Sequence, residues 1–186
     1  MKKLRYLLLS CCLLATAATA ADPAKTMFGV ELGSRFAFPP CARGEDALTK
    51  RHCHNAIQVV KTPWGAEEYQ LFYPRAEVVP YARGELVVDV VNGVIEAIHV
   101  STWGIEAQGT AMAALKAKYG LPARSRTEKI KGMRSRLPTQ FAEWDLKDFS
   151  VRFDGTTSTI DWGRITLVTH RYDQLRKEYA KRATSR

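Results

Sequence analysis

The chain has 186 residues and a formal net charge of +9, which suits one basic domain with its own hydrophobic core. Two domains, each with its own hydrophobic core, would need a longer chain. Beyond the first twenty residues, no stretch is apolar over the roughly 20 residues that a membrane-spanning helix needs, so an integral membrane protein is not expected.

The amino terminus has the layout of a cleavable secretory signal. Three cations come first, at Lys2, Lys3 and Arg5, and a mostly apolar run follows from Leu7 to Ala18. Ala18-Thr19-Ala20 then supplies the small-x-small pattern that signal peptidase reads. Cleavage after Ala20 predicts a signal peptide of residues 1–20 and a single periplasmic or secreted domain of residues 21–186. Removing the three cations lowers the formal charge from +9 to +6.

A competing interpretation concerns Cys11. The run Leu8-Leu9-Ser10-Cys11 looks like a bacterial lipobox, and lipidation of Cys11 would tether the mature chain to a membrane. Cleavage there would leave a signal with almost no apolar core. We therefore prefer cleavage after Ala20, and the lipid anchor stays open as the alternative.

Cys41 and Cys53 are the two cysteines that remain after the signal is removed. An even pair in an exported chain predicts a disulfide, which should stabilise the fold by about 3 kcal/mol through loop closure. Together with His52 and His54, the same cysteines also form a set of four ligands suited to zinc or copper. Adjacent residues seldom all face one ion, and no standard zinc spacing is present. The disulfide is therefore favoured over a metal site, and no cofactor is predicted.

Short strands are expected in the first half of the mature domain, near residues 28–32 and over residues 56–61 and 67–73. The clearest local pattern is a hairpin over residues 85–101, in which two β-branched runs flank Asn92-Gly93.

The turn of this hairpin has two possible lengths. A two-residue turn would set Asp89 opposite Glu96, and like charges directly opposite each other destabilise a sheet. A three-residue loop that ends with Gly93 in the left-handed conformation avoids this pairing, so we favour the longer loop.

A helix is predicted over residues 106–119, because this segment is rich in strong helix formers. Its apolar residues fall on one face at 3.6-residue spacing: Ala111, Met112, Leu115 and Tyr119. Gly120 suits the left-handed cap at the carboxyl end, and Pro122 prevents continuation.

The last third of the chain returns to short extended runs, over residues 141–146, 149–153, 157–161 and 165–169. Residues 172–183 predict a charged terminal helix with an apolar stripe of Tyr172, Leu175 and Tyr179. The elements together predict an α+β fold: an antiparallel sheet with the helix of residues 106–119 packed on one face and a charged C-terminal helix.

The hairpin, the run Ile-x-x-Ile-x-Val-x-Thr and a helix ending in Leu115-Lys-Ala-Lys-Tyr-Gly-Leu-Pro122 resemble small exported proteobacterial domains. These include outer-membrane assembly lipoproteins of the SmpA/OmlA type and proteins with a β-lactamase-inhibitor-like fold. The resemblance covers residues 85–122 and implies binding roles. The chain departs from the lipoprotein pattern because a convincing lipobox is missing and the helix follows the hairpin, so no functional residue is carried over.

The most polarised stretch lies between residues 124 and 136. Its six cations are Arg124, Arg126, Lys129, Lys131, Arg134 and Arg136, with one anion among them. Such a segment can bind an acidic partner, namely a protein surface, lipopolysaccharide or nucleic acid. The alternative is a hairpin whose charges simply face water. Nucleic acid is the least expected partner, because the compartment is wrong and no binding motif is present.

The chain contains none of the standard hydrolase, metalloprotease, P-loop or dinucleotide-binding motifs, so no catalytic residue is predicted. Trp64, Trp103 and Trp162 each precede a glycine at a predicted turn, which suggests that they lie at one end of the sheet, whereas Trp144 is expected in the core. Residues 56–67 and 97–106 share a strand that ends in Trp-Gly followed by an acidic residue, an echo that chance explains better than two related halves.

Three functional hypotheses follow. The first is a non-enzymatic exported binding protein that acts through a protein–protein surface, specifically an inhibitor or immunity protein. The alternative is an envelope-assembly or structural accessory protein. A second alternative is a metal-binding protein or enzyme that uses Cys41, His52, Cys53 and His54. The sequence names neither the partner nor the oligomeric state.

Overall fold

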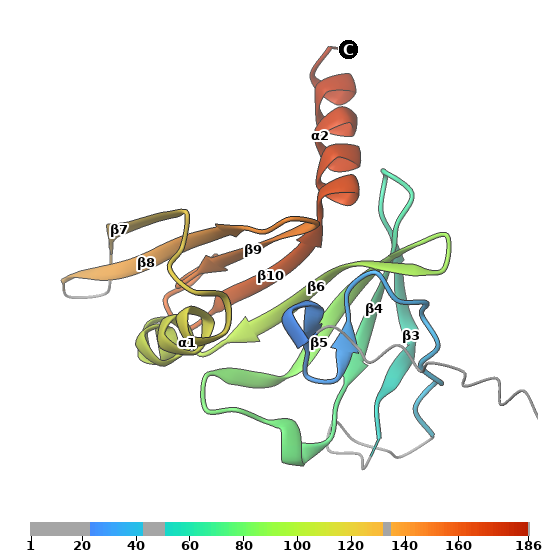
Figure 1. Cartoon of the computed structure of the whole chain (residues 1–186), viewed down its shortest axis with the longest axis horizontal. Helices are drawn as coiled ribbons and strands as arrows, with labels where there is room; N and C mark the ends of the chain where they lie inside the picture. The colour runs from blue at the N-terminus through green and yellow to red at the C-terminus, as the bar shows by residue number, and fades with distance from the viewer. Residues whose placement is uncertain (1–22, 43–50, 132–134, 186) are drawn as a thin grey trace, which may run out of the picture.

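The computed structural model describes residues 23–42, 51–131 and 135–185. Within them, eight strands form one antiparallel sheet in the order β3-β4-β5-β6-β10-β9-β8-β7 (Figure 1). The strands are β3 (Cys53–Lys61), β4 (Glu67–Phe72), β5 (Ala82–Val91), β6 (Val94–Thr102), β7 (Arg124–Lys131), β8 (Arg136–Asp145), β9 (Phe149–Asp154) and β10 (Gly163–Thr169). The helices are α1 (Gly104–Tyr119) and α2 (His170–Thr184). The predicted α+β class is confirmed.

The strand order is a palindrome about the centre of the sheet. Strands β3 to β6 form one antiparallel meander that leads into α1, and strands β7 to β10 form a second meander that leads into α2. The last strands of the two meanders, β6 and β10, pair with each other. The fold is therefore a topological repeat of four strands and a helix. The sequence echo of residues 56–67 and 97–106 does not correspond to it, because those segments are the first and last strands of the same half.

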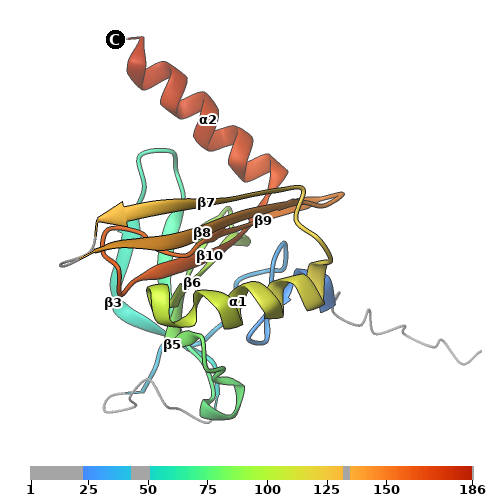
Figure 2. The ribbon, with the colours of Figure 1, turned by 90° about the vertical axis from the view of Figure 1, so that its left-hand side faces the viewer.

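One face of the sheet carries the hydrophobic core, and α1 covers part of it (Figure 2). The buried face of α1 includes Ala111, Met112 and Leu115, as the helical spacing predicts. Trp144 of β8 is buried beneath the helix, and its indole N–H donates to the carbonyl of Gly120 at 2.9 Å. Each fully buried large apolar side chain contributes about 1.5–3 kcal/mol, so this layer accounts for much of the stability.

The amino-terminal segment belongs to the same core layer. It contains a 3₁₀ turn, η1 (Pro23–Lys25), and a two-stranded hairpin of β1 (Thr26–Met27) and β2 (Val30–Glu31). Met27, Val30 and Leu32 are buried among the core residues of the sheet. The strand predicted near residues 28–32 is thus shorter than expected, because Phe28 has a positive φ of 48° and lies in the turn between β1 and β2.

The predicted three-residue loop in the β5–β6 hairpin is wrong. Val91 pairs with Val94, so Asn92 and Gly93 alone form the turn. Their φ angles of 52° and 75° are those of a type I′ turn, whose twist matches that of the flanking strands.

A β-bulge in β6 prevents the pairing of Asp89 with Glu96 that a two-residue turn would otherwise produce. Val90 pairs with Ile95 but Asp89 pairs with Ala97, which leaves Glu96 as the extra residue of β6. Asp89 and Glu96 therefore do not face each other across the ladder.

The strand predicted at residues 157–161 is also wrong, since these residues form turns before β10. Their polar backbone groups pair locally and with the start of α1: Ile105 N–H donates to the carbonyl of Ile160 at 3.0 Å. The loop lies so close to Gly104 that a Cβ there would be 2.1 Å from the same carbonyl oxygen. Gly104 also has a φ of 53°, so glycine is required at this position.

Helix α2 leaves the sheet on the side opposite to α1 (Figures 1 and 2). It begins directly after β10, where Thr169 is the N-cap and its hydroxyl accepts from the N–H of Tyr172. The charged terminal helix predicted over residues 172–183 is confirmed. We call the side of the sheet that bears His99, Arg152 and Arg164 the open face.

Candidate functional site

The first turn of α2 is held by two buried carboxylates from the β5–β6 hairpin. Glu96, the bulge residue, is only 2% exposed; its carboxylate accepts from the Thr169 hydroxyl and pairs with Arg171. Asp89 is 3% exposed, and its Oδ2 accepts from the Tyr172 hydroxyl at 2.7 Å. The bulge thus separates two acidic side chains so that each can bind the start of the helix.

The Asp89 carboxylate is the centre of a longer hydrogen-bond network. His99 Nε2 donates to the same Oδ2 at 3.1 Å, and Trp64 Nε1 donates to the Tyr172 oxygen at 2.7 Å. The other ring nitrogen of His99 lies 3.2 Å from Thr166 Oγ1. An Asp–His–hydroxyl order also occurs in nucleophilic enzymes, but Thr166 is 7% exposed and gives a substrate little access. We interpret His99 as a packed histidine that helps to fix α2.

Asp173, in the first turn of α2, binds two cations, one from the sheet and one from the next turn of the helix. Arg152 of β9 and Lys177 both lie 2.8 Å from Oδ2 of Asp173. Burial raises the pKa of Asp173, but the hydrogen bonds from these two cations lower it more, so the net pKa lies below its usual value. Burial likewise raises the pKa of Asp89, whereas His99, Tyr172 and Arg176 bring it below its usual value.

Acid is expected to lower the free energy of unfolding as the pH falls below about 4. The folded-state pKa values of Asp89 and Asp173 lie below their unfolded values, so their stabilising contribution is present above the unfolded pKa and disappears as both groups are protonated. Urea unfolding between pH 7 and pH 2.5 measures this decline, which Asp173→Asn should flatten and Gln174→Ala on the same turn should not. A slope that Asp173→Asn leaves unchanged would contradict the assignment.

Beyond these anchors, α2 is separate from the core. Tyr172 is its single buried residue, whereas α1, which ends the other half of the fold, buries six. Leu175 and Tyr179 continue the apolar stripe and are partly buried. The Tyr179 ring meets the Trp64 ring edge to face, with centroids 5.9 Å apart. Arg176 is also partly buried, and the rest of α2 faces solvent.

The predicted basic segment forms an exposed hairpin at the edge of the sheet, from β7 into the start of β8. Arg124 and Arg126 lie on the open face, where Arg124 pairs with Glu143 and Arg126 pairs with Glu128. Lys129 and Lys131 point to the other face, which Arg136 shares because it pairs directly with Lys131. Arg134 lies outside the described residues. The structure brings the five described cations to one edge but splits them between two faces.

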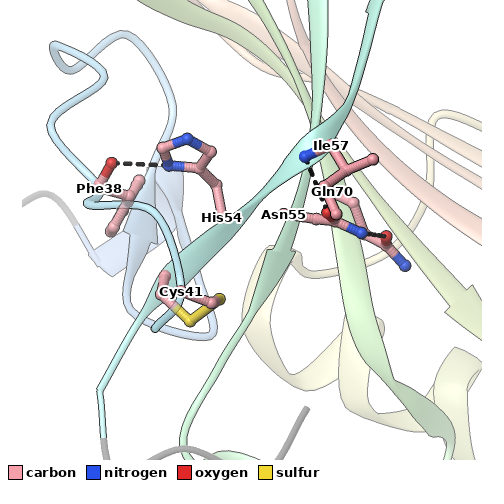
Figure 3. The surroundings of a disulfide bond; sticks show 7 residues. Phe38, Cys41, His54, Asn55, Ile57 and Gln70 are labelled. Carbon is pink, nitrogen blue, oxygen red and sulfur yellow. Dashed lines mark hydrogen bonds between the residues drawn. A yellow bond between two sulfur atoms is a disulfide. The ribbon is translucent and has the colours of Figure 1, made fainter. Parts of the chain in front are cut away.

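Cys41 and Cys53 form the predicted disulfide, and the neighbouring histidines tie the amino-terminal segment to the sheet (Figure 3). His54 Nδ1 donates to the Phe38 carbonyl at 2.9 Å, and His52 Nε2 donates to the Phe28 carbonyl at 2.7 Å. In the described part of the chain, no three His, Cys, Asp or Glu side chains are grouped to hold a metal ion. Neither sulfur is available as a thiolate. The disulfide and the two histidine hydrogen bonds therefore have a structural role, which is to hold the amino-terminal segment against residues 52–54.

The tryptophans separate into two groups. Trp103 and Trp162 lie on either side of Arg83, whose guanidinium carbon is 3.9 Å and 3.8 Å from their ring centroids. Trp64 lies at the opposite end of the sheet, in the β3–β4 turn beside α2, so the expected grouping of all three is wrong.

No protein-family model, curated protein or solved structure matches this chain. The resemblance of residues 85–122 to exported assembly and inhibitor domains stays a prediction. Residues 1–22, which contain the predicted signal, Cys11 and the cleavage site at Ala20, lie outside the described residues. Among the described helices, none is both long and apolar enough to span a membrane.

Sequence reasoning missed the contribution of Asp89, Glu96 and Tyr172 to a single anchoring site. The sequence offered one sign of it, because two acidic residues in otherwise apolar strands of a hairpin require partners when they are buried. The partners themselves come from a helix more than seventy residues away in the sequence.

Proposed function

We propose that the protein is an exported, non-enzymatic binding protein that recognises an acidic protein partner with α2 and the basic edge of its sheet. The observation that supports this most is the difference between the two helices that end the two halves of the fold. Helix α1 buries six residues, three of them in the hydrophobic core, whereas α2 buries only Tyr172. A helix of 15 residues is marginal on its own in water, so its anchored but uncovered length suits contact with another molecule.

The charges of these elements indicate the character of the partner. Helix α2 contains five cations and two anions: Arg171, Arg176, Lys177, Lys181 and Arg182 against Asp173 and Glu178. The β7 edge adds Arg124, Arg126, Lys129 and Lys131 with one anion, Glu128. Complementary charge steers association and selects partners, so an acidic surface is the expected counterpart.

Two further observations support the details of this proposal. The Cys41–Cys53 disulfide suits an oxidising compartment, which supports export. The carboxylates that hold the first turn of α2 fix its direction before any partner arrives, which reduces the ordering cost of binding. An inhibitor or immunity protein that blocks a toxin or hydrolase is the specific form of the proposal.

A pull-down from periplasmic extract, with the mature chain as bait, tests this function. At low salt we expect an acidic protein to be retained, with less at moderate salt because surface charge is screened. Lys181→Gln with Arg182→Gln, and separately Arg124→Gln with Arg126→Gln, the two β7 cations on the face from which α2 leaves, should each reduce the retained amount severalfold. Lys116→Gln with Lys147→Gln removes the same charge from exposed positions outside α2 and the β7 edge and should bind like the wild type.

The retained protein is then identified by mass spectrometry, purified and titrated against the same variants. Retention of nothing at either salt, or equal retention by all variants, would overturn the proposal. Co-fractionation of the whole pool with the outer membrane would favour the envelope-assembly alternative instead.

A further inference from the structure

A groove runs between the β3–β4 turn and the outer part of α2. Its walls are Pro63, Trp64 and Gly65 on one side and Leu175, Tyr179, Arg182 and Ala183 on the other, and its volume is about 620 Å³. This lies within the range of pockets that bind small ligands or peptide side chains. The lining is mostly apolar, in contrast to the charged surface of the rest of α2.

Hydrogen bonds fix the β3–β4 turn and connect it to the first turn of α2. Thr62 N–H donates to the Ala66 carbonyl at 2.8 Å, and Ala66 N–H donates to Thr62 Oγ1 at 2.9 Å, which closes the β3–β4 turn. Trp64 is bound to the Tyr172 hydroxyl, and that hydroxyl is bound to Asp89. The groove therefore exists before a ligand enters it, and binding there costs little ordering of the protein.

The rim of the groove is positive. The Arg176 guanidinium lies 5.4 Å from the centre of the Trp64 ring, and Arg182 contributes to the groove itself. Among the described residues, neither arginine has a carboxylate within ion-pair distance, unlike Arg152 and Lys177, which share Asp173. Arg176 interacts electrostatically with the Asp89 carboxylate, so Arg182 is the more available of the two charges. An apolar floor with two cations on its rim that no direct ion pair neutralises is complementary to an apolar side chain flanked by carboxylates.

We infer that this groove is the anchor site for the partner, and that it binds a short protein segment in which an apolar side chain lies between acidic residues. The inference rests on the proposed function and adds the site and the chemistry of the bound segment. The apolar side chain packs between Trp64 and Tyr179, while the neighbouring carboxylates meet Arg176 and Arg182.

A basic helix with aromatic residues can also bind an anionic membrane, but the geometry favours a protein segment. Membrane-surface helices bury their apolar stripe in the lipid. Here the stripe of Leu175 and Tyr179 faces the β3–β4 turn, where Tyr179 contacts Trp64. A flat bilayer does not enter a groove with a wall on each side, whereas an extended or helical peptide does.

Selection of phage-displayed random 12-residue peptides on the disulfide-bonded mature protein tests the inference. We expect enriched peptides with Asp or Glu around Leu, Ile, Phe or Trp. In calorimetric titrations Tyr179→Ala should weaken their binding at least tenfold, while Tyr179→Phe should retain it because the ring remains. Gln174→Ala, an exposed position of α2 outside the groove, is the control and should bind like the wild type.

The outcomes separate the site from the function. Acidic peptides whose binding is unchanged in Tyr179→Ala but lost in Arg124→Gln with Arg126→Gln would overturn the groove and leave the proposed function standing. Enrichment of basic or purely apolar peptides, or of none, would overturn both. Sedimentation with vesicles of phosphatidylglycerol and phosphatidylcholine that depends on Tyr179 would show a membrane-binding helix and overturn the groove as a peptide site.

Discussion

Replacing Asp89 with alanine is expected to lower the free energy of unfolding by about 3 kcal/mol. The substitution removes the acceptor for both the Tyr172 hydroxyl and the His99 ring, and leaves two polar groups without their partner in a buried site. Because Tyr172 is the one buried residue of α2, the helix should also lose its fixed direction. Urea unfolding measures the stability, and hydrogen exchange of the α2 amides measures the release of the helix.

The matched variant is Asp89→Asn, which keeps an acceptor oxygen of the same shape and loses the charge. Its cost should be about half, and exchange in α2 should rise less. An Asp89→Ala protein within 0.5 kcal/mol of the wild type, or with unchanged exchange in α2, would mean that the carboxylate does not hold the helix. The Asp89→Ala variant keeps Tyr179 itself. If it nevertheless loses peptide binding, the hydrogen bond between Asp89 and Tyr172 is needed to hold the groove in place.

Loss of the disulfide is expected to have an effect of similar size. Cys41 and Cys53 close a loop with a sequence separation of 12, for which loop closure contributes about 3 kcal/mol. The double variant Cys41→Ser and Cys53→Ser should have a free energy of unfolding lower by that amount, measured by urea unfolding. Without the bond, the pairing of residues 39–41 with His54 depends on two backbone hydrogen bonds of 2.9 Å.

Reduced wild-type protein is the control, and its unfolding curve should coincide with that of the double variant. A change below 1 kcal/mol would show that the amino-terminal segment stays docked through its hydrogen bonds and aromatic contacts without the disulfide. The strongest of these are the stacked pairs Phe28–Tyr73 and Phe36–Tyr69, with ring centroids 4.6 Å and 4.3 Å apart.

The elements that the sequence predicts well are those fixed by local chemistry. Helix α1 has a strong helix-forming composition and ends before Gly120, as predicted. Gly120 has a positive φ of 80°, but its ψ of −159° lies outside the left-handed helical region, so the predicted left-handed cap is not formed. The position of the hairpin at Asn92-Gly93 is similarly local, although the favoured three-residue loop was wrong. The disulfide was predicted from compartment and cysteine number rather than from geometry.

The incorrect predictions have tertiary causes. A bulge at Glu96 is invisible in the sequence of the hairpin because its reason is the start of α2, which Glu96 binds. Residues 157–161 have a β-branched composition, but their backbone groups pair locally in turns and, at Ile160, with the start of α1. The stripe of Tyr172, Leu175 and Tyr179 correctly indicated which side of α2 contacts the rest of the protein. It did not indicate on which face of the sheet the helix would lie.

The palindromic strand order has a consequence for how the chain reaches this fold. All strand pairs except β6 with β10 join neighbours in the sequence, so each half can form from local contacts, which favours fast folding. Until β10 arrives, however, β6 is a bare edge, and most of its residues are buried in the finished sheet. Exposed edges of this kind recruit other chains. A chain that stopped before Gly163 would therefore be expected to aggregate, and completion of the second half is the step that covers the β6 edge.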